Sequence, residues 1–484
     1  MIEIRDDEVR AVIARVKARV GPGDSVLPAK PPPPRTTPPP SSYGDGVFPT
    51  IDEAVDAAWE AFARFRDLGL DARHAVIEEI RRTMREKAAE LGRMAWEETG
   101  LGRPDDKHRK NLLVTNKTPG PEDLEADVRS GDFGLTVTEY APYGVIAAIT
   151  PTTNPTATII NNTIAAVSAG NTLVFNVHPN AKRVSVRNIQ EINRAAMRAG
   201  APPNLITGIP EPTLETAQEL MQHPRARILL VTGGPGVVEA ALATRKRAIT
   251  AGPGNPPIVV DETADIEVAG REIVRGASFD NNVICTDEKE IFVVREVAEP
   301  LLQALQRNHC VLLKDYQVRQ LEKVIFRELG PPGKPGKINP KWIGKNAGEI
   351  LGQIGVSAGP EVRLALVDVP KEHSLVWTEQ MMPVMPVVRV QNVDEAIDLA
   401  VRAEHGFGHT AAIYSQRVET ITRMAREINV SIFVANGPTL AGLGEGGEGY
   451  TSFSIASPTG EGLTRPRTFS RLRRLTVKDG LRIV

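Results

Sequence analysis

Hydrophobic residues recur at helical spacing close to the start of the chain. Within residues 4–20, one apolar stripe consists of Val9, Val12, Ile13, Val16 and Val20, a pattern typical of an amphipathic helix. Residues 22–40 contain nine prolines and are predicted to form an extended spacer with no core of its own. Because an isolated helix of about 15 residues is marginal in water, this helix is expected either to dock on a partner or to lie back on its own domain.

From Phe48 onward the pattern is that of a globular α/β protein. Thr50 and Glu53 have the spacing of a capping box, and a longer helix is predicted over 72–98, before Gly100. Strands are then predicted over 143–149, 172–175, 204–207 and 228–231, alternating with helices over 157–169, 187–199, 215–222 and 237–246. This alternation predicts an open parallel sheet with helices on both faces.

A second alternating series begins after Pro257 and predicts a second α/β domain. Residues 473–484 are predicted to form a strand that adds to the edge of a neighbouring sheet.

Composition narrows the class of protein. The 484 residues include 58 basic and 60 acidic side chains, so no overall field favours nucleic acid or an anionic membrane. Two cysteines exclude a disulfide framework and fit a reducing compartment. No apolar run reaches the roughly 18 residues of a membrane span, and no secretory signal is evident. We therefore expect a cytoplasmic protein of two or three domains, and its size suggests an enzyme.

Two polar segments follow predicted strands at the edge where α/β proteins bind ligands. Gly233, Gly234 and Gly236 come after one strand and could let a diphosphate approach the start of a helix. The spacing G-x-G-x-x-G is missing, so an ordinary tight turn is equally compatible. Residues 150–155 follow another strand, and residues 251–257 are rich in glycine and proline and are expected to connect the two domains.

Cysteine supplies the candidate nucleophile. Cys285 lies between a helical stretch and the predicted strand 290–294, where nearby amides could lower the pKa of its thiol. The alternative is a buried structural thiol, which is our interpretation of Cys310. Glu379 precedes another strand and could equally be a surface residue. The eight histidines show no metal-binding spacing.

Several arginines lie close together near the C-terminus. We interpret them as a solvated or interface strand face, with contact to an anion as an alternative; they are Arg465, Arg467, Arg471, Arg473 and Arg474.

Many short motifs occur in one order along the chain: Gly102-Arg103, Asp106-Lys107, Lys110-Asn111, residues 117–120, 139–146, 150–155, Asn161-Asn162, His178-Pro179, 254–257, 281–285 and 458–462. With these motifs, residues 48–484 resemble the aldehyde dehydrogenase superfamily. The resemblance is strongest to its CoA-acylating branch in bacterial microcompartments, the enzymes of propanediol and ethanolamine utilisation.

The resemblance implies an α/β fold with two Rossmann-type parallel-sheet domains, a small β extension for oligomerisation and an N-terminal helical targeting peptide. The expected divisions are an encapsulation peptide at 1–21, a proline-rich linker at 22–47, a nucleotide-binding domain at 48–126 and 141–256, a catalytic domain at 257–456, and the oligomerisation extension at 127–140 and 457–484.

The resemblance also implies roles for individual residues. Cys285 would attack the aldehyde carbonyl, and its backbone amide would help to bind the resulting oxyanion. The amide side chain that completes this site in hydrolytic relatives matches Thr153, whereas this chain has asparagine one residue later, at Asn154. Glu379 would hold the nicotinamide ribose, and the remaining cofactor contacts would come from Pro151, Thr152, Gly233 and Gly234.

The adenosine end of the nucleotide site differs from that of hydrolytic members. Asn176 stands where those members have lysine, and His178-Pro179 follows it. This difference fits a site that NAD and coenzyme A visit in turn.

A missing residue separates the candidate reactions. Aligning Gly254 and Pro257 puts Ala251 where hydrolytic members carry a glutamate base. Attack of water on a thioester benefits from such a base, whereas a thiol supplies its own thiolate. The sequence therefore favours transfer of the acyl group to CoA. The alternatives are a hydrolytic NAD(P)-dependent dehydrogenase and a catalytically silent scaffold of a microcompartment.

The expected partners follow from the same resemblance. They are a short-chain aldehyde, a microcompartment shell protein or enzyme core bound through residues 4–20, and further copies of the chain in a homo-oligomer. Neither nucleic acid nor membrane is expected as a partner, and the protein is expected inside a cytoplasmic microcompartment.

Overall fold

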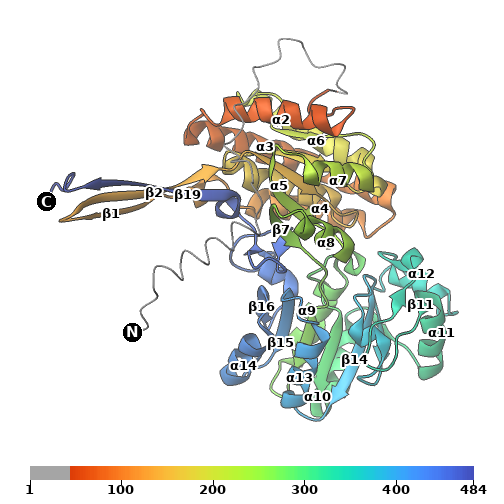
Figure 1. Ribbon diagram of the computed structural model, residues 1–484. Helices are drawn as coiled ribbons and strands as arrows, with labels where there is room; N and C mark the ends of the chain where they lie inside the picture. The colour runs from red at the N-terminus through yellow and green to blue at the C-terminus, as the bar shows by residue number, and fades with distance from the viewer. Residues whose placement is uncertain (1–43) are drawn as a thin grey trace, which may run out of the picture. The chain divides into compact units, whose positions relative to one another are not determined.

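The structure, a computed structural model, describes residues 44–484 (Figure 1). The predicted helix at 4–20 and the proline-rich stretch at 22–40 lie outside the described residues. Residues 44–47, at the end of the predicted linker, already contact the folded chain. Val47 is fully buried and forms a parallel bridge with Gly208.

Five parallel strands form the first sheet, in the order β5-β4-β3-β6-β7. They are β3 (Val145–Ile149), β4 (Thr172–Asn176), β5 (Ile206–Gly208), β6 (Ala226–Thr232) and β7 (Arg247–Ala251). The helices of this half are α2 (Ile51–Phe65), α3 (Leu70–Thr99), α4 (Pro104–Lys117), α5 (Pro155–Ser168), α6 (Lys182–Arg198), α7 (Leu214–Gln222) and α8 (Pro235–Ala243).

Alternate side chains of β3 pack in two different hydrophobic cores, one on each face of the sheet. Ile146 and Ala148 belong to one hydrophobic core, which includes residues of α3, α5 and α6. Val145, Ala147 and Ile149 belong to another, which includes residues of α2, α7 and α8. Successive side chains of a strand point to opposite faces, so a continuous apolar run contributes to both cores.

Most predicted elements of this half exist, but α6 begins at Lys182, five residues before the predicted start at Arg187. The side chain of Glu98 explains the difference. Its carboxylate accepts hydrogen bonds from the backbone N–H groups of Arg183, at 2.9 Å, and Val184, at 2.7 Å. These N–H groups have no partner within the helix, and a residue distant in sequence satisfies them.

Seven parallel strands form the second sheet, in the order β10-β13-β14-β9-β8-β15-β16. They are β8 (Pro257–Val260), β9 (Glu290–Val294), β10 (Cys310–Leu312), β13 (Leu364–Asp368), β14 (Val384–Val390), β15 (Thr410–Tyr414) and β16 (Ile432–Ala435). The helices of this half are α9 (Ile266–Ala277), α10 (Arg295–Arg307), α11 (Asp315–Ile325), α12 (Ala347–Gly352), α13 (Val393–Ala403) and α14 (Val418–Ile428). Short strand pairs are β11 (Phe326–Glu328) with β12 (Lys337–Ile338), and β17 (Ile455–Ala456) with β18 (Gly462–Leu463). The predicted α/β fold with parallel sheets is confirmed.

A third, antiparallel sheet has the order β1-β2-β19. It joins β1 (Asp127–Gly131) and β2 (Gly134–Pro142) to β19 (Ser470–Lys478) near the C-terminus (Figure 1). A strand was predicted over 473–484. Its predicted C-terminal boundary is wrong, because β19 ends at Lys478, six residues earlier. Asp479 and Leu481 have positive φ values of 55° and 62°, a conformation that is incompatible with a continuing strand.

Candidate active site

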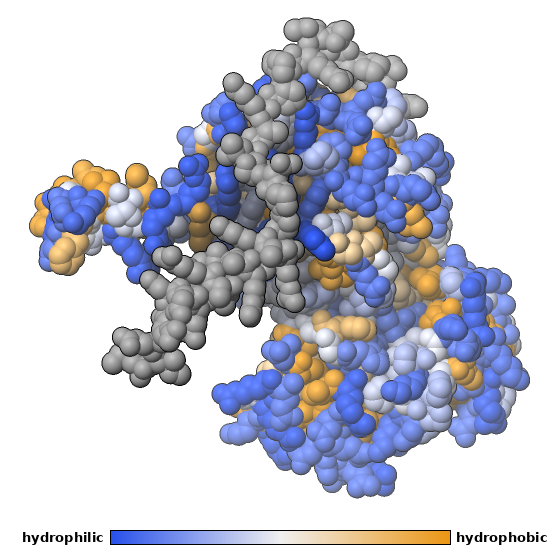
Figure 2. Space-filling view, in the orientation of Figure 1, coloured by the Kyte–Doolittle hydropathy of each residue, from blue (hydrophilic) through white to orange (hydrophobic). Residues whose placement is uncertain are grey.

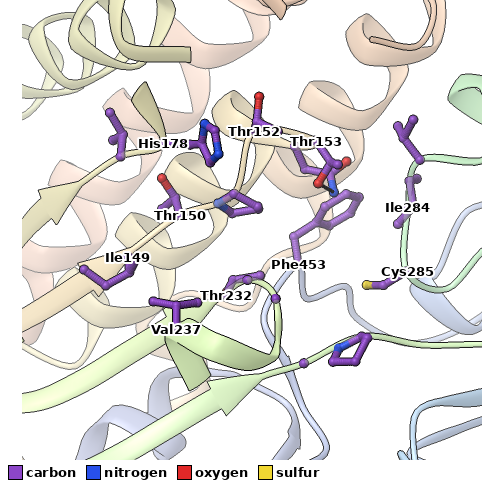
Figure 3. A pocket seen from close by; sticks show the side chains of 18 of the residues that line it. Ile149, Thr150, Thr152, Thr153, His178, Thr232, Val237, Ile284, Cys285 and Phe453 are labelled. Carbon is purple, nitrogen blue, oxygen red and sulfur yellow. Dashed lines mark hydrogen bonds between the residues drawn. The ribbon is translucent and has the colours of Figure 1, made fainter. Parts of the chain in front are cut away.

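A cavity of about 360 Å³ lies at the carboxyl ends of β3, β4 and β6 and extends to the loop that carries Cys285 (Figure 3). All the predicted site residues line it: Cys285, Asn154, Pro151, Thr152, His178, Pro179, Gly233, Gly234 and Glu379. They come from segments up to 228 residues apart in the sequence. The topology therefore brings the proposed nucleophile and the proposed nucleotide contacts into one space.

The Cys285 loop begins with three consecutive left-handed residues. Asp280, Asn281 and Asn282 have φ values of 45°, 57° and 65°, which Asp and Asn tolerate better than other non-glycine residues. The Asn281 amide donates to the carbonyl of Gly344 at 2.9 Å. The Asn282 amide donates to the carbonyls of Ala277 and Glu288, both at 2.8 Å. These bonds fix the backbone that leads to Cys285.

The surroundings of Cys285 disfavour its ionised form. Burial, followed by the negative charge of Glu379, raises the pKa of the Cys285 thiol to about 12. Burial also raises the pKa of the Glu379 carboxyl, and the nearby Lys289 opposes that rise. One Glu379 oxygen accepts a hydrogen bond from the backbone N–H of Gly254 at 3.4 Å.

Cys310, in contrast, begins β10 and packs in a hydrophobic core. Burial raises the pKa of its thiol. Its position agrees with a structural role.

Asn154 is the residue before α5, and its amide is held from two sides. The amide oxygen Oδ1 accepts a hydrogen bond from the Lys110 ammonium at 2.5 Å. The amide nitrogen Nδ2 donates to Thr153 Oγ1 at 3.1 Å. The two candidates for the oxyanion site therefore touch each other, with the asparagine donating.

Two hydroxyl groups that line the cavity lack hydrogen-bond partners among the described residues. The hydroxyl oxygens of Thr150 and Thr152 are buried and form no hydrogen bond with any residue of 44–484. Both residues line the cavity. Buried hydroxyls are normally satisfied, so these two are suited to a bound polar group.

The turn between β6 and α8 offers a second point of approach. Gly234 precedes the first residue of α8, and a Cβ added there would meet no atom within 4 Å. The first N–H groups of a helix attract phosphate. The open backbone at Gly234 and the two free hydroxyls fit the predicted dinucleotide.

Two residues at the end where the adenosine was predicted form hydrogen bonds with their own surroundings. His178 Nδ1 accepts a hydrogen bond from the backbone N–H of Asn180 at 3.1 Å, and burial lowers the pKa of the His178 imidazole. The Asn176 amide donates to the carbonyl of Thr213 and accepts from the Thr216 hydroxyl. Asn176 is thus engaged by the segment that begins α7 (Leu214–Gln222).

The end of the cavity near the sulfur is mainly apolar. Ile284 and Phe453 lie beside Cys285 (Figure 3), and Val283, Leu443 and Ile455 add to the wall. Such a surface suits a small apolar chain.

Sequence reasoning assigned no role to three buried charges beside this site. Lys107 and Lys110 on α4 both form ion pairs with Asp280. The lysines occur within two motifs that carried the family resemblance, but spacing alone does not reveal their common partner 170 or more residues away.

Neither metal ligation nor a membrane span is indicated in residues 44–484. No group of three or more His, Cys, Asp or Glu residues there is arranged to hold a metal ion. No helix in this range is long and apolar enough to cross a bilayer.

Comparison with known proteins places the chain in a family. The model of the aldehyde dehydrogenase family matches residues 43–312 and 355–456. An acetylating acetaldehyde dehydrogenase, EutE of Salmonella typhimurium, is 48% identical over 440 residues, which are 91% of this chain and 94% of that protein.

Two solved structures have similar folds. Propionaldehyde dehydrogenase of Rhodopseudomonas palustris, with bound CoA and an acylated cysteine, superposes with a TM-score of 0.88 at 46% identity, covering 91% of this chain and 100% of that one. The propionaldehyde dehydrogenase of the Clostridium phytofermentans fucose utilisation microcompartment also has a TM-score of 0.88, at 42% identity, covering 91% of this chain and 100% of that one. With the family match, the shared fold and the cavity beside Cys285, this chain belongs to the aldehyde dehydrogenase family.

Proposed function

We propose that the protein is a CoA-acylating aldehyde dehydrogenase, which converts a short-chain aldehyde, NAD⁺ and CoA into an acyl-CoA and NADH. The named activities of its relatives support this assignment, since these are acetylating or propionaldehyde dehydrogenases. The apolar wall beside Cys285 supports a short aliphatic substrate.

Cys285 is the proposed nucleophile. Its sulfur bonds to the aldehyde carbon and gives a thiohemiacetal, whose oxyanion is stabilised by the Cys285 backbone amide and the Asn154 Nδ2 group. Loss of hydride from the same carbon leaves a thioester on Cys285. The raised pKa of the thiol means that only a small fraction of the free enzyme carries the reactive thiolate.

NAD⁺, when bound, supplies the hydride acceptor. Glu379 would hold the nicotinamide ribose, while Thr152, Gly233 and the open backbone at Gly234 would bind the diphosphate region. Pro151 would border the same region. His178 and Pro179 lie toward the adenosine end, which NAD and CoA would occupy in turn.

Residues 251–253 favour transfer of the acyl group to CoA over its hydrolysis, because none of them has a carboxylate side chain. Ala251 ends β7 and is buried, and Gly252 and Pro253 line the cavity. This segment therefore contributes no carboxylate to activate water, and a second thiol is the better acceptor of the acyl group.

The experiment compares NADH formation with and without CoA. With CoA we expect steady turnover; without it we expect at most one equivalent of NADH per Cys285. Undiminished steady turnover without CoA would favour the hydrolytic alternative. Complete inactivity of the folded protein with both co-substrates and a series of short aldehydes would favour the scaffold.

We further propose the divisions set out from the sequence, with a nucleotide-binding domain at 48–126 and 141–256, a catalytic domain at 257–456 and an oligomerisation extension at 127–140 and 457–484. An exposed apolar face supports the last. Leu475, Val137 and Val128 lie directly opposite one another across β19, β2 and β1, and Val128 and Leu475 are 57% and 64% exposed. Figure 2 shows apolar side chains at the surface of this ribbon.

Residues 1–21 are proposed as an encapsulation peptide, followed by a linker that begins at residue 22 and ends before the folded residues 44–47. Their apolar stripe and proline content support this role. A relative from a fucose utilisation microcompartment supports the setting. The protein would then act inside a cytoplasmic microcompartment.

A further inference from the structure

The amide of Asn154 has two possible orientations, and only one offers its nitrogen to an oxyanion. Lys110 distinguishes between them. An ammonium group donates hydrogen bonds and accepts none, so Lys110 Nζ, 2.5 Å from Asn154 Oδ1, requires the amide oxygen on its own side. The nitrogen then lies on the side of Thr153, to whose hydroxyl oxygen it donates.

The Asn154 nitrogen keeps one hydrogen for a ligand. Nδ2 has two hydrogens, and Thr153 Oγ1 accepts one of them. No other residue within 44–484 accepts the second. Asn154 lines the cavity, so a negatively charged oxygen on the substrate is a suitable acceptor.

Lys110 is itself anchored to the Cys285 loop. Its ammonium pairs with Asp280 Oδ2, five residues before Cys285. Asp280 Oδ1 accepts from the backbone N–H of Arg103 at 2.6 Å, at the start of α4. One buried lysine thus contacts both the proposed oxyanion donor and the loop that carries the proposed nucleophile.

We infer that Lys110 is a positioning residue, which fixes the orientation of the Asn154 amide and its register with the Cys285 loop. This inference rests on the oxyanion role of Asn154 within the proposed function. Lys110 does not line the cavity; it acts through Asn154. Its charge also withdraws electrons from the amide oxygen, which makes the amide N–H a stronger donor.

Lys107 provides a matched control. It lies one turn earlier on α4, is also fully buried and also pairs with Asp280, at 3.0 Å. Its other bond goes to the backbone carbonyl of Thr153 at 3.2 Å, and no hydrogen bond joins it to the Asn154 side chain. A change at Lys107 thus disturbs the same carboxylate and the same helix without freeing the amide.

The test is a double-mutant cycle on the full-length enzyme, with acyl-CoA formation as readout. Asn154→Ala should lower kcat by about 100-fold or more, the usual effect of losing an oxyanion donor. Lys110→Met should lower kcat by about 10- to 100-fold, with KM for NAD⁺ and CoA changed by less than about threefold. In the Asn154→Ala background, Lys110→Met should have less than about a twofold further effect, since the residue on which it acts is absent.

The control and a conservative variant separate positioning from general damage. Lys107→Met should lower the melting temperature about as much as Lys110→Met but lower kcat by less than about threefold. Lys110→Gln, which can still donate to Asn154 Oδ1, should recover part of the loss and serves if Lys110→Met fails to fold.

Two outcomes overturn the inference in different ways. An equally large effect of the Lys110 substitution in the Asn154→Ala background would show that Lys110 acts elsewhere, and the proposed function would stand. Unchanged kcat in Asn154→Ala would remove the oxyanion role of Asn154 from the proposed function, and the inference with it.

Discussion

At the scale of single residues, three consecutive residues shortly before Cys285 adopt the strained left-handed conformation, and side-chain hydrogen bonds stabilise it. Such conformations cost about 1–3 kcal/mol each in general, and less for Asp and Asn. Hydrogen bonds from the Asn281 and Asn282 side chains offset this cost. These bonds fix the backbone ahead of Cys285 without a ligand, and such preorganisation is what the proposed oxyanion role of its amide requires.

Replacement of Cys285 by alanine tests the nucleophile. We expect Cys285→Ala to lower kcat by about 10⁴-fold or more, because no other group can form the thioester, while the melting temperature stays within a few degrees. Cys310→Ala is the control: it leaves a small cavity in the core, lowers stability by about 1 kcal/mol and retains activity. Comparable loss in both variants would contradict the assignment.

The thiol pKa gives a prediction on pH. Since burial and Glu379 raise the pKa of Cys285 to about 12, the thiolate fraction should grow about tenfold per pH unit from pH 7 to 9. The alkylation rate of Cys285 by iodoacetamide, measured without NAD in a Cys310→Ala background, should follow that slope. A plateau at or below pH 8 would contradict the raised pKa.

Glu379→Gln extends this prediction. Removing the negative charge lowers the thiol pKa, so alkylation at pH 8 should become faster than in the parent enzyme. A slower reaction in the folded variant would mean that Glu379 promotes ionisation of the thiol.

Several residues that line the cavity could be predicted from the sequence, whereas the buried ion pairs beside it could not. Local motifs drew attention to Cys285 and Asn154, whereas Glu379 was singled out only by the family resemblance; the fold brings all three to one cavity. The Lys110–Asp280 ion pair was not predicted. A lysine on a helix is ordinarily solvated, and the two residues are 170 positions apart in the sequence.

At the scale of elements, two boundaries were misplaced because a distant residue or a turn decides them, and α4 and β7 were not predicted. The parallel strands were predicted from short apolar runs between helical stretches. This pattern is local, and the predicted ends of these strands are within two residues of the observed ones. The start of α6 depends on Glu98 from the end of α3, a contact that no local pattern contains. The end of β19 depends on a turn at Asp479, whose N–H donates to the carbonyl of Phe133.

Lysine substitutions on the two opposite faces of β19 test which face holds the copies of the chain together in the proposed homo-oligomer. Leu475→Lys places a charge on the apolar face shared with Val137 and Val128 and should shift the protein to smaller species in sedimentation velocity. Thr476→Lys introduces the same side chain on the other face and should leave the distribution unchanged. If neither or both variants dissociate, the apolar face is not the assembly surface.

At the scale of the whole molecule, residues 1–20 should be separable from catalysis. Every residue that lines the described cavity lies beyond position 148. Deleting residues 1–20 should therefore leave kcat within about twofold, because every described lining residue stays in place, and abolish co-purification with microcompartment shells. Deleting residues 28–34 instead, which shortens only the spacer, should preserve packaging. Loss of activity with retained packaging would refute the targeting role.

The fate of the acyl group on Cys285 distinguishes transfer to CoA from hydrolysis. The most direct test is mass spectrometry of the products after propionaldehyde is oxidised with NAD⁺ and saturating CoA. We predict propionyl-CoA in amounts equal to the NADH formed, with little propionate. Propionate as the main product despite abundant CoA would contradict the account.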